Sequence, residues 1–239
     1  MLIDYEIRFS SKRKTLGIVV ERDGRIVVLA PEGLAPSHIA EIVQKKQQWI
    51  LSKLHDSAKY PIEPMEKEFV SGESILYLGK ECQLVVIDDK WFDGVEYNGN
   101  FHIARHTQLK ANTVFRGWYT RQAYEIIKPL ADSYAQSLGV SFNECRVSEM
   151  KYRWASCTPN KNLVFNWRTI KAPLTVIHYL IVHELAHLIE PTHNSDFWNI
   201  VAAQLPRYEE AKEWLRQHGN LLETALIWLM GLKPDMKIS

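Results

Sequence analysis

One segment constrains the fold of this chain more than any other: residues 172–190, APLTVIHYLIVHELAHLIE. It has helical character and is apolar on nearly every face, and such a helix is stable only where protein surrounds it. Pro173 suits the first turn of the helix, and Pro191 should end it near Ile189 or Glu190. The chain must therefore form a core that encloses a helix of about five turns.

This helix carries an HExxH motif, in which His183 and His187 flank Glu184. Residues four apart lie on the same face of a helix, so both imidazoles can bind one metal ion, with the carboxylate beside them. Two neutral nitrogen ligands and a carboxylate suit a zinc ion that activates water, with Glu184 as the base that takes the proton. The alternative is a pair of core histidines hydrogen-bonded to backbone. Burying the carboxylate without a cation would then be costly, and this favours the metal.

A catalytic zinc usually needs a third protein ligand. We favour His193, because the chain can turn back to the ion after Pro191 and imidazole is a common zinc ligand. The alternatives are three carboxylates on a later helix: Glu209, Glu210 and Glu213. The spacing of the three histidines equals that of the metzincin motif, although Glu190 stands where that motif has glycine. We expect one Zn²⁺ per chain, and a structural role for His178, which faces elsewhere on the helix.

The chain changes from strand-like to helical patterns at about residue 108. Residues 1–107 contain short β-branched and aromatic runs separated by turns such as Asp23-Gly24, with one amphipathic helix over residues 36–56. We predict an α+β fold with a β-rich N-terminal domain, a metal-binding domain over residues 108–220, and an apolar tail, residues 221–239, that packs on the core.

Within the second domain, a long helix should end at Gly139 and be followed by a β-hairpin over residues 145–169. After the HExxH helix, two shorter helices are expected near residues 195–205 and 207–218, separated by Pro206. The hairpin directly precedes the HExxH helix in the sequence, and consecutive elements are usually neighbours in space.

The totals describe an ordinary globular protein of 239 residues, with 46 % hydrophobic residues and a formal net charge of +1. The global charge predicts neither a nucleic-acid nor a membrane partner. The N-terminus lacks a signal-peptide pattern, and no segment approaches the roughly 18 apolar residues needed to cross a bilayer. Three cysteines without a CxxC pair argue against a disulfide framework, so we expect a cytoplasmic protein with reduced thiols.

Several segments resemble the YgjP-like metal-dependent hydrolases, whose zinc helix is related to that of SprT-type metallopeptidases. The most specific are YRWASC, NLVFNWR, APLTVIHYLIVHELAHL and HNSDFW, and the N-terminal segments IRFSSKRKTLGIVV and PEGLAPSHIAEIVQKKQQWI are also similar to that family. The resemblance implies a zincin-like α+β metallohydrolase domain, with zinc held by His183, His187 and His193 and with Glu184 as catalytic base.

The preferred hypothesis for the substrate is a peptide or unfolded protein. In a zincin peptidase a β-strand lies beside the zinc helix, so that an extended peptide can pair with its edge and present a carbonyl to the metal. The hairpin at residues 145–169 could supply this strand, with Tyr152 and Arg153 as candidate donors to the oxyanion. Magnesium-dependent pyrophosphatases bind their metal with clustered carboxylates, whereas histidine ligands suit zinc. The histidine-rich site therefore favours a metallopeptidase.

Local charge supports a competing hypothesis, because no Asp or Glu occurs between Met150 and His183. Five basic residues fall in this interval: Lys151, Arg153, Lys161, Arg168 and Lys171. If they face the cleft, they would attract a phosphate or nucleic acid, and Lys151 and Arg168 join the candidate substrate-binding residues. Otherwise they form a solvated face paired with acids from elsewhere. The alternatives to a peptidase are a zinc-dependent nucleoside triphosphate pyrophosphatase, an activity also attributed to the YgjP-like group, and a DNA-associated protein with a structural zinc, which would have no use for Glu184.

Overall fold

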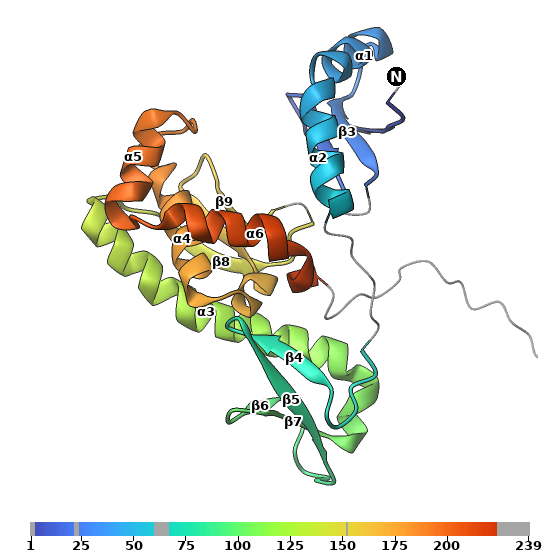
Figure 1. Cartoon of the computed structure of the whole chain (residues 1–239), viewed down its shortest axis with the longest axis vertical. Helices are drawn as coiled ribbons and strands as arrows, with labels where there is room; N and C mark the ends of the chain where they lie inside the picture. The colour runs from blue at the N-terminus through green and yellow to red at the C-terminus, as the bar shows by residue number, and fades with distance from the viewer. Residues whose placement is uncertain (1–2, 22–23, 60–66, 152, 224–239) are drawn as a thin grey trace, which may run out of the picture.

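The computed structural model describes residues 3–21, 24–59, 67–151 and 153–223 (Figure 1). Within these residues, three small sheets and six α-helices form two hydrophobic cores, and the α+β prediction is confirmed. None of the helices in the described part of the chain combines the length and the apolar character needed to cross a bilayer.

The first core belongs to an N-terminal unit of three strands and two helices: β1 (Glu6–Ser10), β2 (Gly17–Val20), β3 (Ile26–Pro31), α1 (Pro36–Lys45) and α2 (Gln47–Lys59). β3 lies between the other two strands, parallel to β1 and antiparallel to β2, and the β2–β3 pair agrees with the hairpin predicted around Gly24. The single helix predicted over residues 36–56 is instead two helices. They separate at Lys46, whose backbone leaves the helical conformation.

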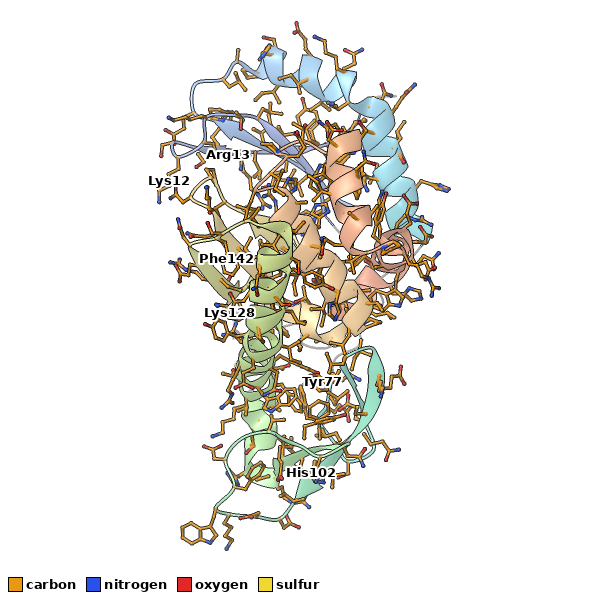
Figure 2. All side chains as sticks on the ribbon, turned by 90° about the vertical axis from the view of Figure 1, so that its left-hand side faces the viewer. Lys12, Arg13, Tyr77, His102, Lys128 and Phe142 are labelled. Carbon is orange, nitrogen blue, oxygen red and sulfur yellow. The ribbon has the colours of Figure 1, made fainter. Side chains whose placement is uncertain are left out.

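A second sheet packs on the first half of a long helix. The elements of this part are β4 (Ser74–Tyr77), β5 (Lys80–Ile87), β6 (Glu96–Tyr97), β7 (Phe101–Ala104), the 3-10 helix η1 (Arg105–Lys110) and α3 (Ala111–Leu138). The strand order is β4-β5-β7-β6, with β5 and β7 parallel. Tyr77 lies at the contact between sheet and helix (Figure 2), where the Phe101 ring centroid is 5.4 Å from that of Phe115 and 5.1 Å from that of Trp118. Aromatic packing therefore joins this sheet to α3.

The two hydrophobic cores do not divide the chain at residue 107. The core that contains the HExxH helix begins at Phe69 and extends to Leu222, so it includes β4, β5 and β7. The last buried residue of the N-terminal core is Ile50, and the partly buried Leu54 packs against this core. The reason is that α3 packs both on the second sheet and on the HExxH helix. We therefore propose a division into residues 1–59 and 67–223, in place of the expected boundary between 107 and 108.

The third sheet positions the candidate site and consists of β8 (Glu144–Ser148), β9 (Ala155–Cys157) and β10 (Asn162–Asn166) in the order β8-β10-β9. β9 and β10 form an antiparallel hairpin, whereas β8 runs parallel to β10, so the prediction of one hairpin over residues 145–169 was wrong for its first strand. The intervening segment leaves the sheet because the Asn166 side-chain amide donates to the carbonyls of Met150 (2.8 Å) and Arg153 (3.2 Å). Among the described residues, β9 is the last strand of this sheet and therefore has one open edge.

The remaining elements are the 3-10 helix η2 (Trp167–Lys171), α4 (Leu174–Ala186), α5 (Ser195–Gln204) and α6 (Tyr208–Glu223). α3 ends at Gly139 with φ of 67°, as predicted. α4 ends before the predicted position, although the N–H groups of Ile189 and Glu190 still donate to the Ala186 carbonyl. The two shorter helices expected after it are α5 and α6. Of the predicted tail, Leu222 is buried in the core, Leu221 is exposed, and residues 224–239 lie outside the described residues.

Candidate metal centre

α4 is the buried helix that the sequence predicted, and α3, α5 and α6 pack around it (Figure 1). The residues buried along it are Val176, Ile177, Tyr179, Leu180, Ile181, Val182, Glu184, Leu185 and Ala186. Glu184 is the single charged residue among them and its side chain is 6 % exposed. His183 and His187 are half-buried on the face that opens to solvent. One turn of this helix therefore presents two imidazoles on one face and a carboxylate beside them.

The imidazoles of His183, His187 and His193 lie together. The ring centroids of His183 and His187 are 5.1 Å apart, and the His193 centroid is 4.9 Å from the first and 4.7 Å from the second. Nε2 of His183 is 3.0 Å from Nε2 of His193. One ligand atom from each residue lies within 4.8 Å of the others. Three nitrogen donors thus converge on one point at the end of α4.

A hydrogen-bonded turn brings His193 back to the helix. The Glu190 carboxylate accepts hydrogen bonds from the Thr192 backbone N–H (3.0 Å) and from the Thr192 hydroxyl (2.7 Å). The Asn194 side chain then caps α5 by accepting from the Phe197 N–H at 3.0 Å. Glu190 has no positive φ. The chain therefore makes this return without the glycine that the metzincin motif has at the same position.

Aromatic side chains support the three imidazoles from behind. Phe197 is fully buried, and its ring centroid is 4.9 Å from that of His183 and 4.7 Å from those of His187 and His193. Trp198 stacks on His193 at 5.8 Å. The Tyr179 hydroxyl is 3.4 Å from Nδ1 of His183, on the side of the ring away from His193. These contacts restrict the orientations available to the imidazoles.

Burial controls the protonation of the cluster. It lowers the pKa of His183 to about 3, and the neighbouring charges of His187, His193 and Lys212 act in the same direction. Burial also lowers the pKa of His187, while hydrogen bonds from its ring to the backbone of Glu190 and Pro191 oppose this effect. Both imidazoles on α4 are therefore neutral near pH 7, which is the form that binds metal.

The carboxyl group of Glu184 has the opposite shift. Burial raises its pKa to about 7, and a hydrogen bond from the backbone of Cys157 together with the positive charge of Arg153 partly offsets this effect. A carboxylate in this position is stabilised by any added positive charge nearby. The protein supplies a weak acid beside the cluster that can accept or release a proton near neutral pH.

These residues fit a divalent metal ion. Two nitrogen ligands of a tetrahedral zinc, each at 2.0–2.1 Å, would lie about 3.3 Å apart, close to the 3.0 Å that separates Nε2 of His183 from Nε2 of His193. The hydrogen bonds from the His187 ring to backbone carbonyls orient that ring as is common for metal ligands. A donor set of three imidazoles is typical of zinc, and within the described residues it leaves one coordination position without a protein ligand.

The cluster lines a cleft of about 640 Å³ between α4 and β9. The lining residues are Arg153, Ala155, Ser156, Cys157, Thr158, Pro159, Lys161, His183, Glu184, His187, Leu188, Pro191 and His193. β9 contributes its residues along its open edge, since β10 pairs with the other edge. A second cavity of about 610 Å³ shares Arg153, Ala155, His183 and Glu184 with the first and continues along α6. An extended chain could therefore pass the imidazoles beside an unpaired strand edge.

The family comparison decides the classification of this site. The YgjP-like family, described as a YgjP-like metallopeptidase domain, matches residues 14–218, which include the whole cluster. The chain belongs to the YgjP-like family. It therefore contains a metallohydrolase domain, and membership of this family implies that the domain binds a divalent metal ion.

Two further comparisons concern individual proteins. The chain is similar to the crystal structure of the metallopeptidase zymogen of Pyrococcus abyssi abylysin, with 24 % sequence identity and a TM-score of 0.37. That similarity covers 43 % of this chain and 100 % of the other. A comparison with curated proteins gives no significant match.

The structure separates the substrate-binding residues predicted for this YgjP-like protein. Arg153 lines the cleft and donates a hydrogen bond to the Ser156 hydroxyl at 3.2 Å. Lys151 instead pairs with Glu21 of the N-terminal unit, at 3.0 Å between Nζ and Oε1. Tyr152 lies outside the described residues. Of the four candidates, Arg153 is the one that the described residues place in the cleft.

Arg168 is largely buried and does not line the cleft. Its guanidinium pairs with Glu149 and with Glu223 and lies 4.3 Å from the ring centroid of Trp167. Lys171 is fully buried, and its ammonium donates to the Leu222 carbonyl at 3.0 Å. The basic run of residues 151–171 therefore does not form one surface. Lys151 and Arg168 pair with acids from elsewhere, as the alternative interpretation held, but Lys171 is buried and bonds a carbonyl, so the run is not one solvated face.

The carboxylates considered as rival ligands lie apart from the imidazole cluster. Within the described residues, the group of His, Cys, Asp and Glu side chains that could hold a metal is His183, His187 and His193. Glu209 and Glu213 line the second cavity, and Glu210 pairs with Arg207, which directly precedes α6. His178 accepts or donates a hydrogen bond with the Tyr134 hydroxyl at 2.9 Å, in line with the structural role expected for it.

Sequence analysis missed the residues that surround the cluster. Phe197 and Trp198 belong to the segment HNSDFW, and the Asn194 cap could have placed both on the first turn of a helix beginning beside His193. Ser156 and Cys157 could not have been found in this way, because their position in the cleft depends on the pairing of β9 with β10.

Proposed function

We propose that this YgjP-like protein is a zinc-dependent peptidase in which His183, His187 and His193 bind one Zn²⁺ and Glu184 is the general base. The observation that carries the proposal is the convergence of three imidazoles and one buried carboxylate on a cleft bordered, within the described residues, by an open strand edge. When bound, zinc supplies Lewis acidity that polarises a carbonyl and makes water more acidic.

The protein's own residues would then divide the remaining work. The open edge of β9 would hold an extended peptide by main-chain hydrogen bonds, which fixes the peptide beside α4. Glu184, which lines the cleft beside the imidazoles, would accept a proton from the attacking water and pass it to the departing amine. Arg153, which lines the same cleft, is our candidate donor to the oxygen of the scissile carbonyl.

The other two hypotheses lose their main support. A nucleotide hydrolase relied on the whole basic run facing the cleft, but only two of its five members, Arg153 and Lys161, line the cleft, while Lys151 and Arg168 are in ion pairs with acids from other elements. A purely structural zinc would need a closed coordination shell, whereas the three imidazoles leave a position free and Glu184 lines the adjoining cleft. Peptide hydrolysis is therefore the function that this arrangement supports best.

The proposal is tested by substituting Glu184→Gln, which keeps the shape of the side chain and removes its basicity. We expect the variant to bind about one zinc per chain and to lose at least a hundredfold in the rate of cleavage of an unfolded protein. Glu210→Gln is the matched control, because that carboxylate pairs with Arg207 outside the cleft and its loss should leave both measurements unchanged.

The substrate class is tested in the same experiment. Wild type and Glu184→Gln are assayed in parallel on unfolded protein and on nucleoside triphosphates, with and without chelator. Full activity of Glu184→Gln would refute the assignment of the base. Release of pyrophosphate by the wild type without peptide cleavage would refute the peptidase itself.

A further inference from the structure

Lys161 has a backbone conformation that lysine rarely adopts. It lies in the turn between β9 and β10 with φ of 55°, in the left-handed region. The turn is fixed by hydrogen bonds from the Thr158 N–H to the Asn162 carbonyl (2.9 Å) and from the Lys161 N–H to the Thr158 carbonyl (2.8 Å). From outside the turn, the Asn143 backbone N–H donates to the Lys161 carbonyl (2.9 Å), and the Asn143 side-chain amide donates to the Asn160 backbone carbonyl (2.8 Å). The turn therefore holds this conformation whichever residue occupies position 161.

The strain at Lys161 is not explained by packing. Among the described non-glycine residues, positive φ also occurs at Phe69 and Leu78, and both pack into the hydrophobic core. Lys161 is exposed, and glycine or asparagine would adopt the same conformation with less strain. An unfavourable backbone conformation next to a reactive centre suggests a functional role for the side chain.

Lys161 lines the cleft that contains the three imidazoles. Two cationic side chains, Lys161 and Arg153, face this cleft, and Glu184 is the single acid in its described lining. Arg153 already acts on Glu184 and bonds to Ser156. Lys161 makes no ion pair within the part of the chain that the structure describes. The turn end of the cleft therefore carries a positive charge with room for an anion.

We propose that Lys161 is a specificity-determining residue that binds a carboxylate of the peptide substrate. The proposal rests on the proposed peptidase function and names the chemistry that the enzyme prefers. A peptide paired with the open edge of β9 would continue past the end of that strand toward the turn of residues 158–161. An Asp or Glu side chain, or the C-terminal carboxylate of a short substrate, would there meet the Lys161 ammonium.

The test compares peptides that differ by one charge. Extended decapeptides carry Glu at one position at a time, each paired with its Gln isostere, and a second set compares a free C-terminal carboxylate with the amide. Affinities are measured by fluorescence anisotropy with the zinc-loaded Glu184→Gln chain. The best acidic peptide should bind about fivefold tighter than its neutral partner at low salt, and the difference should fall at about 0.5 M salt, where the Debye length is only about 4 Å.

Two substitutions at position 161 and one control substitution separate the effect of charge from the effect on stability. Lys161→Asn should abolish the preference and raise the melting temperature by about 2 °C, because asparagine tolerates the left-handed conformation. Lys161→Arg should keep the preference. Lys80→Asn removes an exposed lysine from the distant sheet β4–β7 and should change neither measurement.

The outcomes distinguish this proposal from the peptidase proposal. Equal affinity for acidic and neutral peptides, or a preference that survives Lys161→Asn, would overturn the role of Lys161 even if the wild type cleaves peptides. A preference that depends on Lys161, in a zinc-loaded wild type that cleaves no peptide, would support the carboxylate site and overturn the peptidase. A lower melting temperature for Lys161→Asn would show that the backbone at Lys161 is not strained and would overturn that part of the inference.

Discussion

The packing of Phe197 against the imidazoles predicts how strongly this protein should hold its metal. Phe197 is fully buried and contacts the rings of His183, His187 and His193 at centroid distances of 4.7–4.9 Å. Phe197→Leu keeps the site apolar but removes the planar ring that limits rotation of the imidazoles. Each aromatic contact contributes about 0.5–1.5 kcal/mol, so the substitution should lower the free energy of unfolding by about 2 kcal/mol.

The same substitution should also weaken zinc binding. Residues that orient metal ligands typically contribute 10–100-fold to affinity, and we expect a loss of at least tenfold, about 1.4 kcal/mol. Zinc affinity is measured by competition with a chromophoric chelator. Stability is measured by urea unfolding of the metal-free chain and by thermal melting, where about 2 kcal/mol corresponds to a shift of about 4–8 °C.

Phe115→Leu is the matched control. Phe115 is equally buried and contacts three aromatic rings, those of Phe69, Phe101 and Tyr119, away from the imidazoles. It should lose a similar amount of stability and keep the zinc affinity of the wild type. If both variants lost stability but Phe197→Leu bound zinc within twofold of the wild type, the proposed link between packing and metal affinity would be refuted.

Two further predictions concern the third ligand and the backbone near α4. His193→Ala should lower zinc affinity by at least a hundredfold, whereas Glu209→Gln should leave it unchanged, as equilibrium dialysis would show; the reverse result would make the carboxylate the ligand. Gly79→Ala should lower the free energy of unfolding by about 2 kcal/mol or more, because Gly79 has φ of 77° and an added Cβ would lie 2.7 Å from Cγ of Pro173, which begins α4. Gly94→Ala, with open space around it, should change the urea midpoint little, and equal effects at both positions would contradict this explanation.

Local patterns predicted the HExxH helix and most of the elements around it. The spacing of His183 and His187 fixes their common face in any α-helix, and the apolar residues around them require burial, so both features could be inferred without a tertiary structure. The C-terminal end of α3 at Gly139 and the hairpin turn at Gly24 were predictable for the same reason, since each depends on the conformational freedom of one residue.

Predictions failed where a residue's partner is distant in the sequence. The predicted first strand of the hairpin is two separate strands, β8 and β9, because the Asn166 side-chain amide donates hydrogen bonds to the carbonyls of Met150 and Arg153 between them. No periodicity in the sequence indicates this contact. Arg168 resembled a cleft residue by its position in a basic run, but Glu149 and Glu223 hold it elsewhere. The sign and spacing of charges are properties of the sequence, whereas their pairing depends on which elements meet.

The sequence by itself determined that this chain contains a buried helix with two imidazoles and a carboxylate on one turn, because helical geometry relates residues four apart in every fold. Only the tertiary structure decided that the favoured His193, and not a carboxylate of a later helix, lies with them, which strand edge borders the cleft, and that Lys161 alone among the lysines of the basic run lines that cleft in the described residues. These features arise from contacts between segments that the chain brings together only when its apolar surfaces are buried, and a local pattern carries no information about that assembly.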